Sequence, residues 1–346
     1  MQHGHVGRKR GGYLMHRARL IFQDGAELSV PVEAGQTVLE GALAVDAPLR
    51  YDCCTGSCGS CVVQCVDGTT VVDSTGKVPV NADELAEGLR PACLTRLSSD
   101  ATFEMPYPLN AAPSLPAKHS GVIFNLRLAA PSVALLTLKL DRAEGLTFQS
   151  GQYVRLAAPG VGEARAYSIA STAAELPLIE LMIRLVPDGK MSRWVQDTAK
   201  VGDRVRLQAP LGSFGLDDRA HRHVFVAGGT GLAPVLSMIR SLRGRGASAL
   251  LCFGCTRRQD LFYVEELAAL AASMPELEVR IAVMEGAEGA LRSGTAVSLL
   301  DPTDFESDTV CYLCGPPPMV DAARKTLSAH GVPAGAIRAE RFQPGG

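Results

Sequence analysis

Short strand-like and helical stretches alternate along the first hundred residues of the chain. Two strand-like stretches flank the turn Asp24-Gly25, which is a common turn pair between strands. The predicted elements are strands over residues 17–23 and 27–32, an apolar helix around 37–45 and a closing strand over 101–106. This mixture of strands and a helix predicts an α+β domain over residues 17–106.

Residues 119–216 are strand-like throughout. Glycine and proline interrupt the apolar stretches at the spacing expected of a small antiparallel barrel. The predicted strands cover residues 122–128, 134–140, 152–156, 179–185 and 204–207. We therefore expect an antiparallel β-barrel domain in this part of the chain.

Strands and helices alternate in the last block, residues 217–346. Such alternation predicts a parallel, doubly wound α/β sheet. The predicted strands cover residues 223–227, 249–253, 278–283 and 309–314, and the predicted helices cover 232–244, 263–273 and 317–330. The chain is thus expected to be multidomain, with three successive folds.

Two segments lack periodicity. Residues 107–118 contain three prolines in twelve positions, which predicts a stiff, semi-extended linker. Residues 1–16 are rich in glycine and include a basic run over 8–10, and we expect a disordered leader there.

Composition narrows the class of protein. The 346 residues have a hydrophobic fraction of 47% and a net charge of −2, so charge gives no sign of nucleic-acid or anionic-membrane binding. No stretch approaches the roughly 20 apolar residues of a membrane span. No apolar signal-peptide region is visible, and we expect a cytoplasmic monomer. Because disulfides are disfavoured in the cytoplasm, the ten cysteines need another explanation.

Four cysteines in the first block have the spacing of a plant-type [2Fe–2S] site. The run C-x4-C-x2-C is followed, after 31 intervening residues, by a fourth cysteine. Gly56 and Gly59 tolerate a positive φ, which lets backbone N–H groups approach the cluster sulfides. The predicted ligands are Cys53, Cys58, Cys61 and Cys93.

Alternatives to this assignment are weaker. A structural zinc site would favour paired C-x2-C knuckles, and the block has one. Cys54 could compete with Cys53, but only Cys53 gives the four-residue gap. Cys65 follows in an apolar run, where we expect a buried thiol that binds no metal.

A flavin motif follows in the barrel. Arg165-Ala166-Tyr167-Ser168 resembles the signature R-x-Y-S of the ferredoxin–NADP reductase superfamily. The resemblance implies that Arg165 pairs with the FAD pyrophosphate, that Tyr167 stacks near the isoalloxazine and that Ser168 lies beside flavin N5, at the reacting atoms. A forked guanidinium suits a diphosphate.

Two more segments resemble the same flavin site. Gly189-Lys190-Met191-Ser192, which opens the helical stretch with Trp194, resembles the family's second phosphate contact, made by backbone N–H groups. For Ser192 alone, a plain N-cap role is the alternative, and both roles are compatible. Residues 209–214 resemble the turn G-x-x-G-x-F that ends the family's barrel.

The last block contains two motifs that resemble the family's nicotinamide site. A buried strand leads into the Gly-Gly-Thr-Gly-x-Ala-Pro turn, where glycines let a diphosphate approach the backbone. A later segment resembles C-G-P-P-x-M, whose cysteine lies close to the nicotinamide C4; alone, that cysteine would be a buried strand-end thiol. The implied contacts are Gly228, Gly229, Thr230, Gly231, Pro234, Cys314, Gly315 and Pro316, with Cys314 at the reacting atoms.

The order of the blocks resembles the reductase components of bacterial oxygenases, such as those of benzoate dioxygenase, naphthalene dioxygenase and methane monooxygenase. This resemblance implies a β-grasp-like ferredoxin domain, an FAD barrel and a nicotinamide domain. NADH would donate a hydride to FAD, and FAD would release its two electrons one at a time to the cluster. The cluster would pass them to a terminal oxygenase of Rieske or di-iron type. Such an oxygenase would act on an aromatic or hydrocarbon substrate.

Other functions remain open. A reductase of the same domain order that serves another acceptor, such as a sugar-deoxygenation enzyme, is the nearest alternative, and a redox-sensing module is a more distant one. A membrane quinone reductase would need an N-terminal span. The nucleotide preference is also open, because Arg257 and Arg258 stand where an acid would bind the ribose of NADH. The resemblance to this family favours NADH as the donor, and the two arginines leave NADPH possible.

Overall fold

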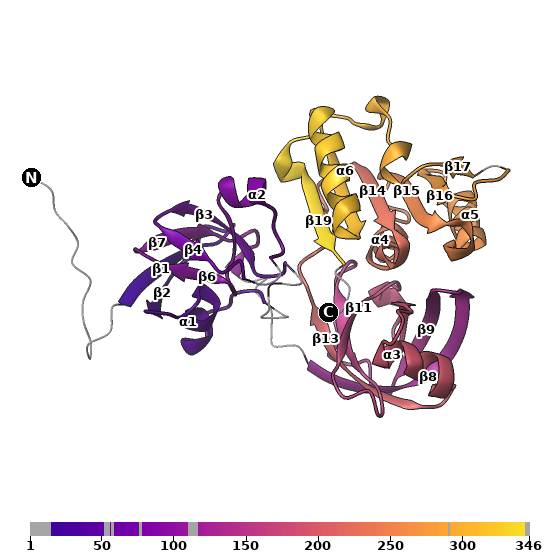
Figure 1. The fold of residues 1–346 in the computed structure, drawn as a ribbon, viewed down its shortest axis with the longest axis horizontal. Coiled ribbons are helices and arrows are strands. Elements are labelled where there is room, and N and C mark those ends of the chain that lie inside the picture. The colour runs from indigo at the N-terminus through magenta and orange to yellow at the C-terminus, as the bar shows by residue number, and fades with distance from the viewer. Residues whose placement is uncertain are drawn as a thin grey trace, which may run out of the picture. The chain divides into compact units, whose positions relative to one another are not determined.

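The computed structural model describes residues 15–51, 56, 59–75, 78–109, 117–289 and 291–342. The chain divides into two compact units, Met1–Leu115 and Pro116–Gly346. The first unit contains a mixed sheet, and the second contains an antiparallel sheet and a parallel sheet (Figure 1). No helix within the described ranges is long and apolar enough to cross a membrane.

The first unit is an α+β domain. Its elements are β1 (Met15–Ile21), β2 (Glu27–Glu33), α1 (Val38–Ala44), β3 (Val62–Asp67), β4 (Thr70–Val72), α2 (Ala82–Ala86), β5 (Leu89–Pro91), β6 (Thr95–Leu97) and β7 (Ala101–Glu104). The main sheet has the order β2-β1-β7-β3-β5, with β1 and β7 parallel. Helix α1 packs on this sheet, since Val38, Leu20 and Phe103 share one buried core. The predicted α+β class is confirmed.

The predicted leader is two residues too long. Strand β1 begins at Met15, and His16 in that strand lies with its Nδ1 3.8 Å from Oδ1 of Asp100. Met15 and His16 are in register with Glu33 and Val32 of β2, so they belong to the sheet. Residues 1–14 lie outside the described part of the chain.

The predicted linker is too long at both ends. Tyr107 is buried, and its hydroxyl accepts a hydrogen bond of 2.8 Å from the backbone N–H of Arg50, so it belongs to the first core. Ala117 and Lys118 pair with the barrel sheet. Residues 110–116 lie outside the described part.

The second unit begins with an antiparallel barrel. Its strands are β8 (Ala117–Ala130), β9 (Val133–Leu140), β10 (Tyr153–Ala157), β11 (Arg165–Ser168), β12 (Leu178–Arg184) and β13 (Arg204–Leu211), and helix α3 (Lys190–Arg193) follows β12. The order is β11-β10-β13-β8-β9-β12, and a bridge from Ile169 to Leu181 joins the two edges. The sheet is therefore nearly closed around a core that includes Leu136 and Leu156. The barrel prediction is confirmed.

A parallel α/β sheet completes the second unit. Its elements are β14 (Arg222–Gly228), α4 (Leu232–Ser241), β15 (Ser248–Arg257), α5 (Val264–Ser273), β16 (Leu277–Glu285), β17 (Arg292–Ser293), β18 (Thr309–Gly315), α6 (Pro317–Ala329) and β19 (Ile337–Arg341). Alternate residues of β14 face opposite layers: Phe225 packs with α4 and α5, and Val224 packs with α6. Helices thus cover both faces, as predicted for a doubly wound sheet.

The strand order identifies the ligand-binding edge of this sheet. In the order β17-β16-β15-β14-β18-β19, the chain leaves β14 for one side and later returns to β18 on the other. Ligands of open α/β sheets bind beyond the carboxyl ends of strands at such a switch point. Here those ends are Gly228 of β14 and Gly315 of β18.

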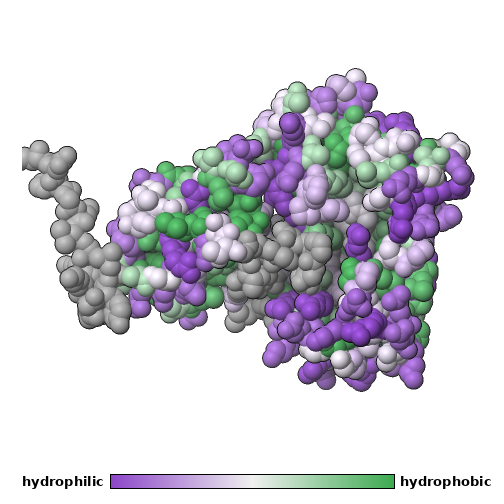
Figure 2. Space-filling view, viewed as in Figure 1, coloured by the Kyte–Doolittle hydropathy of each residue, from purple (hydrophilic) through white to green (hydrophobic). Residues whose placement is uncertain are grey.

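The surface drawn in Figure 2 is mixed. Hydrophilic residues cover most of the visible face of the second unit, and hydrophobic residues reach the surface in separate patches. Large exposed apolar side chains include Phe124, Leu128 and Val201. Scattered apolar residues of this kind are usual on globular proteins.

Candidate functional site

Two of the four predicted cluster ligands lie in the described part of the first unit. Cys61 begins the segment that enters β3, and Cys93 follows β5; both are buried. The backbone N–H of Ala92 donates to the carbonyl of Cys61 at 3.0 Å, which brings these two cysteine segments together. Cys53, Cys54 and Cys58 lie outside the described residues, so the four-ligand set stays a prediction.

Residues near the predicted cluster ligands test two further expectations, the positive φ of the loop glycines and the burial of Cys65. Gly56 and Gly59 have φ values of +74° and +80°, a region that glycine enters without steric cost. Cys65 is half-buried rather than fully buried, because it lies near the end of β3, and its Sγ donates to the carbonyl of Asp67 at 3.5 Å. Burial raises the pKa of this thiol.

The predicted flavin residues share strand β11. Arg165 and Ser168 lie at its two ends, about 10 Å apart along an extended backbone. The guanidinium of Arg165 is partly exposed, with Nη2 3.3 Å from Oε2 of Glu163, whereas Ser168 is buried. Tyr167 packs against the barrel core, and burial raises its pKa, so its phenol is neutral. The strand thus presents a charged group at one end and a buried hydroxyl at the other.

Tyr153 lies beside the predicted flavin residues and was not identified in the sequence analysis. It lies on β10 directly opposite Ser168, and it is 4% exposed. Its hydroxyl has no hydrogen-bond partner among the described residues. An unpaired buried hydroxyl costs about 1–3 kcal/mol, which a bound group with a polar edge would recover. A flavin ring beside Ser168 has such an edge, so these residues fit FAD.

Helix α3, which follows β12, begins at a different N-cap residue from the one considered in the sequence analysis. Gly189 is the N-cap residue of α3, and Ser192 lies inside the helix. The Ser192 hydroxyl accepts a hydrogen bond of 2.9 Å from the N–H of Val186, so the plain N-cap role for Ser192 is wrong. A Cβ on Gly189 would lie 2.7 Å from Cγ2 of Val186, which explains the glycine. Met191 is buried and Lys190 is exposed.

Backbone segments are in direct contact at the carboxyl ends of β14 and β18. We call residues 228–231 and 314–316 the nucleotide edge. A Cβ on Gly231 would lie 2.2 Å from the carbonyl oxygen of Cys314, and one on Gly228 would lie 2.6 Å from Sδ of Met319. The end of β14, the start of α4 and the end of β18 can therefore meet only where side chains are missing. Thr230 is buried in this turn, Pro234 is buried in the first turn of α4, and Pro316 precedes α6.

Cys314 lies at the centre of this edge and is fully buried. It is in register with Ala227 on β14 and with Glu340 on β19, and its Sγ donates to Oε2 of Glu340 at 3.9 Å. Burial, and then the carboxylate of Glu340, raise the pKa of the thiol well above its usual value. Cys314 is therefore a neutral thiol that can position a neighbour but not attack it. Glu340 was not identified from the sequence, because β19 has no apolar pattern.

Acidic side chains pair with Arg257, the last residue of β15, and with Arg258, which follows it. Nε of Arg257 lies 2.8 Å from Oδ2 of Asp260, and Arg258 pairs with Glu288. Asp260 also accepts a hydrogen bond of 2.8 Å from Ser132 in the barrel, and its pKa is lowered, chiefly by the hydrogen bond from Arg257. Both guanidinium groups are thus partly neutralised by the chain itself.

Comparison with known proteins identifies three cofactor-binding domains in the chain. The model of the 2Fe-2S iron-sulfur cluster binding domain matches residues 21–98, that of the oxidoreductase FAD-binding domain matches 123–215, and that of the oxidoreductase NAD-binding domain matches 225–325. These matches confirm the predicted cofactors, [2Fe–2S], FAD and NAD(H).

Curated relatives and a solved structure match most of the chain. The toluate 1,2-dioxygenase electron transfer component of Pseudomonas putida is 30% identical over 95% of this chain and 99% of that protein. Methane monooxygenase component C of Methylosinus trichosporium is 40% identical over 71% of this chain and 75% of that protein. The crystal structure of the Amycolatopsis cytochrome P450 reductase GcoB matches with a TM-score of 0.70 and 30% identity, over 94% of this chain and 99% of that one. The chain therefore belongs to the family of iron–sulfur flavoprotein oxidoreductases that includes the electron transfer components of multicomponent oxygenases.

Proposed function

We propose that this protein oxidises NADH and delivers single electrons to a separate terminal oxygenase. The observation that supports this most is the presence of three cofactor domains on one chain, with the flavin strand β11 and the nucleotide edge in one compact unit. FAD, when bound, accepts two electrons as a hydride and releases them singly. A one-electron cluster on the same chain is the natural outlet for those electrons.

The residues divide the work as follows. Arg165 holds the pyrophosphate through its guanidinium, with Gly189, Lys190, Met191 and Ser192 as the second contact. Tyr167, Ser168 and Tyr153 surround the ring. The dinucleotide is held by Gly228, Gly229, Thr230, Gly231 and Pro234. The neutral thiol of Cys314 orients the nicotinamide, together with Gly315 and Pro316. Cys53, Cys58, Cys61 and Cys93 hold the cluster.

We also propose NADH rather than NADPH as the donor. A 2′-phosphate would need a free guanidinium, and Asp260 and Glu288 already pair with Arg257 and Arg258. The ribose hydroxyls of NADH make no such demand.

The partner is proposed from the relatives. They include components of a dioxygenase and of a methane monooxygenase, which supports an acceptor of Rieske or di-iron type acting on an aromatic or hydrocarbon substrate. A cytochrome P450 is a second candidate acceptor, because one structure matched over 94% of the chain is a cytochrome P450 reductase. We still predict that the protein is cytoplasmic and monomeric.

Substitution of Cys93 by serine tests the electron path in the full chain. We expect the variant to lose its cluster and its reduction of cytochrome c, while NADH-dependent reduction of ferricyanide, which can accept electrons from flavin, continues. Cys65→Ser is the matched control and should keep both activities. Full cytochrome c reduction by a Cys93→Ser protein without iron would contradict the proposed order of transfer.

A further inference from the structure

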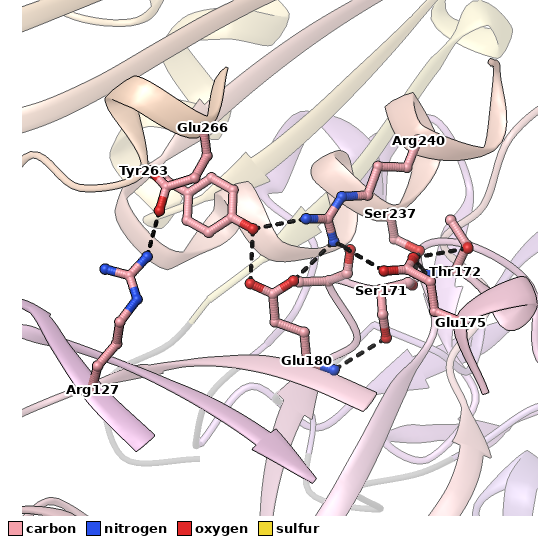
Figure 3. A network of polar contacts seen from close by, with 10 residues as sticks. Arg127, Ser171, Thr172, Glu175, Glu180, Ser237, Arg240, Tyr263 and Glu266 are labelled. Atoms are coloured by element: carbon pink, nitrogen blue, oxygen red, sulfur yellow. Dashed lines mark hydrogen bonds and ion pairs between the residues drawn. The ribbon is translucent and has the colours of Figure 1, made fainter. Parts of the chain in front are cut away.

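Three side chains that none of the motifs includes form a closed ring where the barrel meets the α/β sheet (Figure 3). Glu180 extends from β12, Arg240 from α4, and Tyr263 from the residue before α5. Nη1 of Arg240 lies 2.8 Å from Oε2 of Glu180, and Nη2 of Arg240 donates to the Tyr263 hydroxyl at 2.7 Å. The Tyr263 hydroxyl donates in turn to Oε1 of Glu180 at 2.8 Å. We call this ring the clamp.

The clamp is shielded enough for its hydrogen bonds to be strong. The side chains of Arg240 and Glu180 are 23% and 17% exposed, so their ion pair is less screened than a surface pair. Burial and the nearby carboxylate of Glu180 raise the pKa of Tyr263, which keeps its phenol protonated and able to donate. Each of the three groups therefore has its partner within the ring.

Helix α4 connects the clamp to both cofactor regions. It begins at Leu232, directly after Gly231 of the nucleotide edge. Further along the same helix, the Ser237 hydroxyl donates to the carbonyl of Ser171 at 2.6 Å, and Arg240 donates to the carbonyl of Ala170 at 3.0 Å. Ala170 and Ser171 come two and three residues after Ser168 of the flavin strand. One short helix thus joins the nucleotide edge to the backbone of the flavin strand.

The backbone of Tyr263 gives a second, independent indication. This residue has φ +65° and ψ +18°, the left-handed conformation, which is unusual for a bulky side chain and costs of order 1 kcal/mol or more. Strain of this kind persists where the surroundings fix the residue, and it gathers at functional sites. Here the conformation holds the Tyr263 hydroxyl between Arg240 and Glu180.

We propose that Glu180, Arg240 and Tyr263 are positioning residues that set the distance and angle between the nucleotide edge and the flavin strand for hydride transfer. The inference rests on the proposed function. Hydride transfer needs reacting atoms about 3–3.5 Å apart, and a displacement of about 1 Å can lower its rate a hundredfold. The clamp residues are separate from the nucleotide edge, so their loss should alter this geometry without removing the contacts that bind NADH.

Tyr263→Phe and Arg240→Met test the proposal in the FAD-loaded full chain. Anaerobic stopped-flow mixing with NADH gives the limiting rate of flavin reduction and, from its concentration dependence, the Kd for NADH. We expect the limiting rate to fall about tenfold or more, with the Kd within about twofold of wild type. The long-wavelength charge-transfer absorption of the NADH–flavin complex should weaken as well, because it depends on how the rings overlap. Arg240→Lys, which keeps the charge beside Glu180, should recover part of both signals.

Arg243→Met is the matched control. Arg243 lies three residues after Arg240, is exposed, and donates to the Ser273 hydroxyl at 3.1 Å, so its loss should leave the rate and the absorption band unchanged. A lowered melting temperature in Tyr263→Phe with an unchanged limiting rate and band would overturn the proposal, because the clamp would then be purely structural. A wild-type protein whose flavin NADH does not reduce would instead refute the proposed function.

Discussion

The nucleotide edge and the clamp lie along the same helix, α4, and are built in opposite ways. At the edge, Gly228 and Gly231 let backbone segments touch because no side chain intervenes. At the clamp, long side chains from three elements bridge the gap between two domains. The edge is therefore sensitive to any added atom, and the clamp is sensitive to any removed one. The glycine motif was visible in the sequence, whereas the clamp was not.

The largest effect should come from Gly231→Ala at the edge. A Cβ there would lie 2.2 Å from the Cys314 carbonyl, and backbone atoms must move to relieve the clash. We expect the free energy of unfolding to fall by more than about 3 kcal/mol and NADH-dependent flavin reduction to be lost. Urea denaturation and stopped-flow mixing measure both. Gly335→Ala, where the Cβ would meet open space, is the control. Wild-type stability in Gly231→Ala would disprove the close contact.

Cys314→Ala removes a side chain from the edge without adding one. We expect the limiting rate of flavin reduction to fall about tenfold, with little change in the Kd for NADH, because the thiol orients rather than binds. Cys311→Ala is the control: it lies on the same strand, is equally buried, and should lower stability by a similar amount, about 1 kcal/mol, without changing the rate. Equal rates in both variants would make Cys314 a packing residue.

Tyr153→Phe tests a buried hydroxyl for which the described part of the chain offers no hydrogen-bond partner. Removing the hydroxyl should raise the Kd for FAD about fivefold, the value of one hydrogen bond. The FAD-free protein should be no less stable than wild type, since the hydroxyl has no hydrogen-bond partner among its described residues. Calorimetric titration and thermal melting separate the two results. In the control Tyr107→Phe, which loses its bond from Arg50, stability should fall and FAD binding should not change. An FAD affinity unaffected by Tyr153→Phe would remove Tyr153 from the site.

The smallest effect is expected for Asp260→Asn. Arg257 is about half exposed, and exposed pairs contribute little, so freeing its guanidinium should raise kcat/KM for NADPH by only about threefold. Asparagine can still accept from Ser132, which preserves the contact with the barrel. The gain should shrink as salt is added. A wild-type protein that prefers NADPH would show that the acids do not neutralise the arginines.

Hydrophobic pattern alone identified most strands of the barrel and of the α/β sheet, but only three of the seven strands in the first unit. The missed strands are β3, β4, β5, β6, β11, β17 and β19. Of these, β11 and β19 have too few apolar residues to show a period. Motifs placed the site residues on β11 and at the nucleotide edge. They could not reveal Tyr153, Glu340 or the clamp, whose members are joined across 60 and 83 residues of sequence. Pairings of that kind depend on register and domain packing, which no local pattern encodes. The cap at Ser192 failed for a similar reason, since its partner Val186 lies outside the helix.

Burial of Cys314 also bears on how long the protein can work beside oxygen-consuming chemistry. Cysteine oxidation by peroxide begins with the thiolate, and it requires access of the oxidant to sulfur. The Cys314 thiol has a raised pKa and no exposed surface, so both requirements are unmet. The Cys314 sulfur at the nucleotide edge is thereby kept in its reduced form without any repair enzyme. Such resistance to damage is a property of the fold, and it would persist through many turnovers.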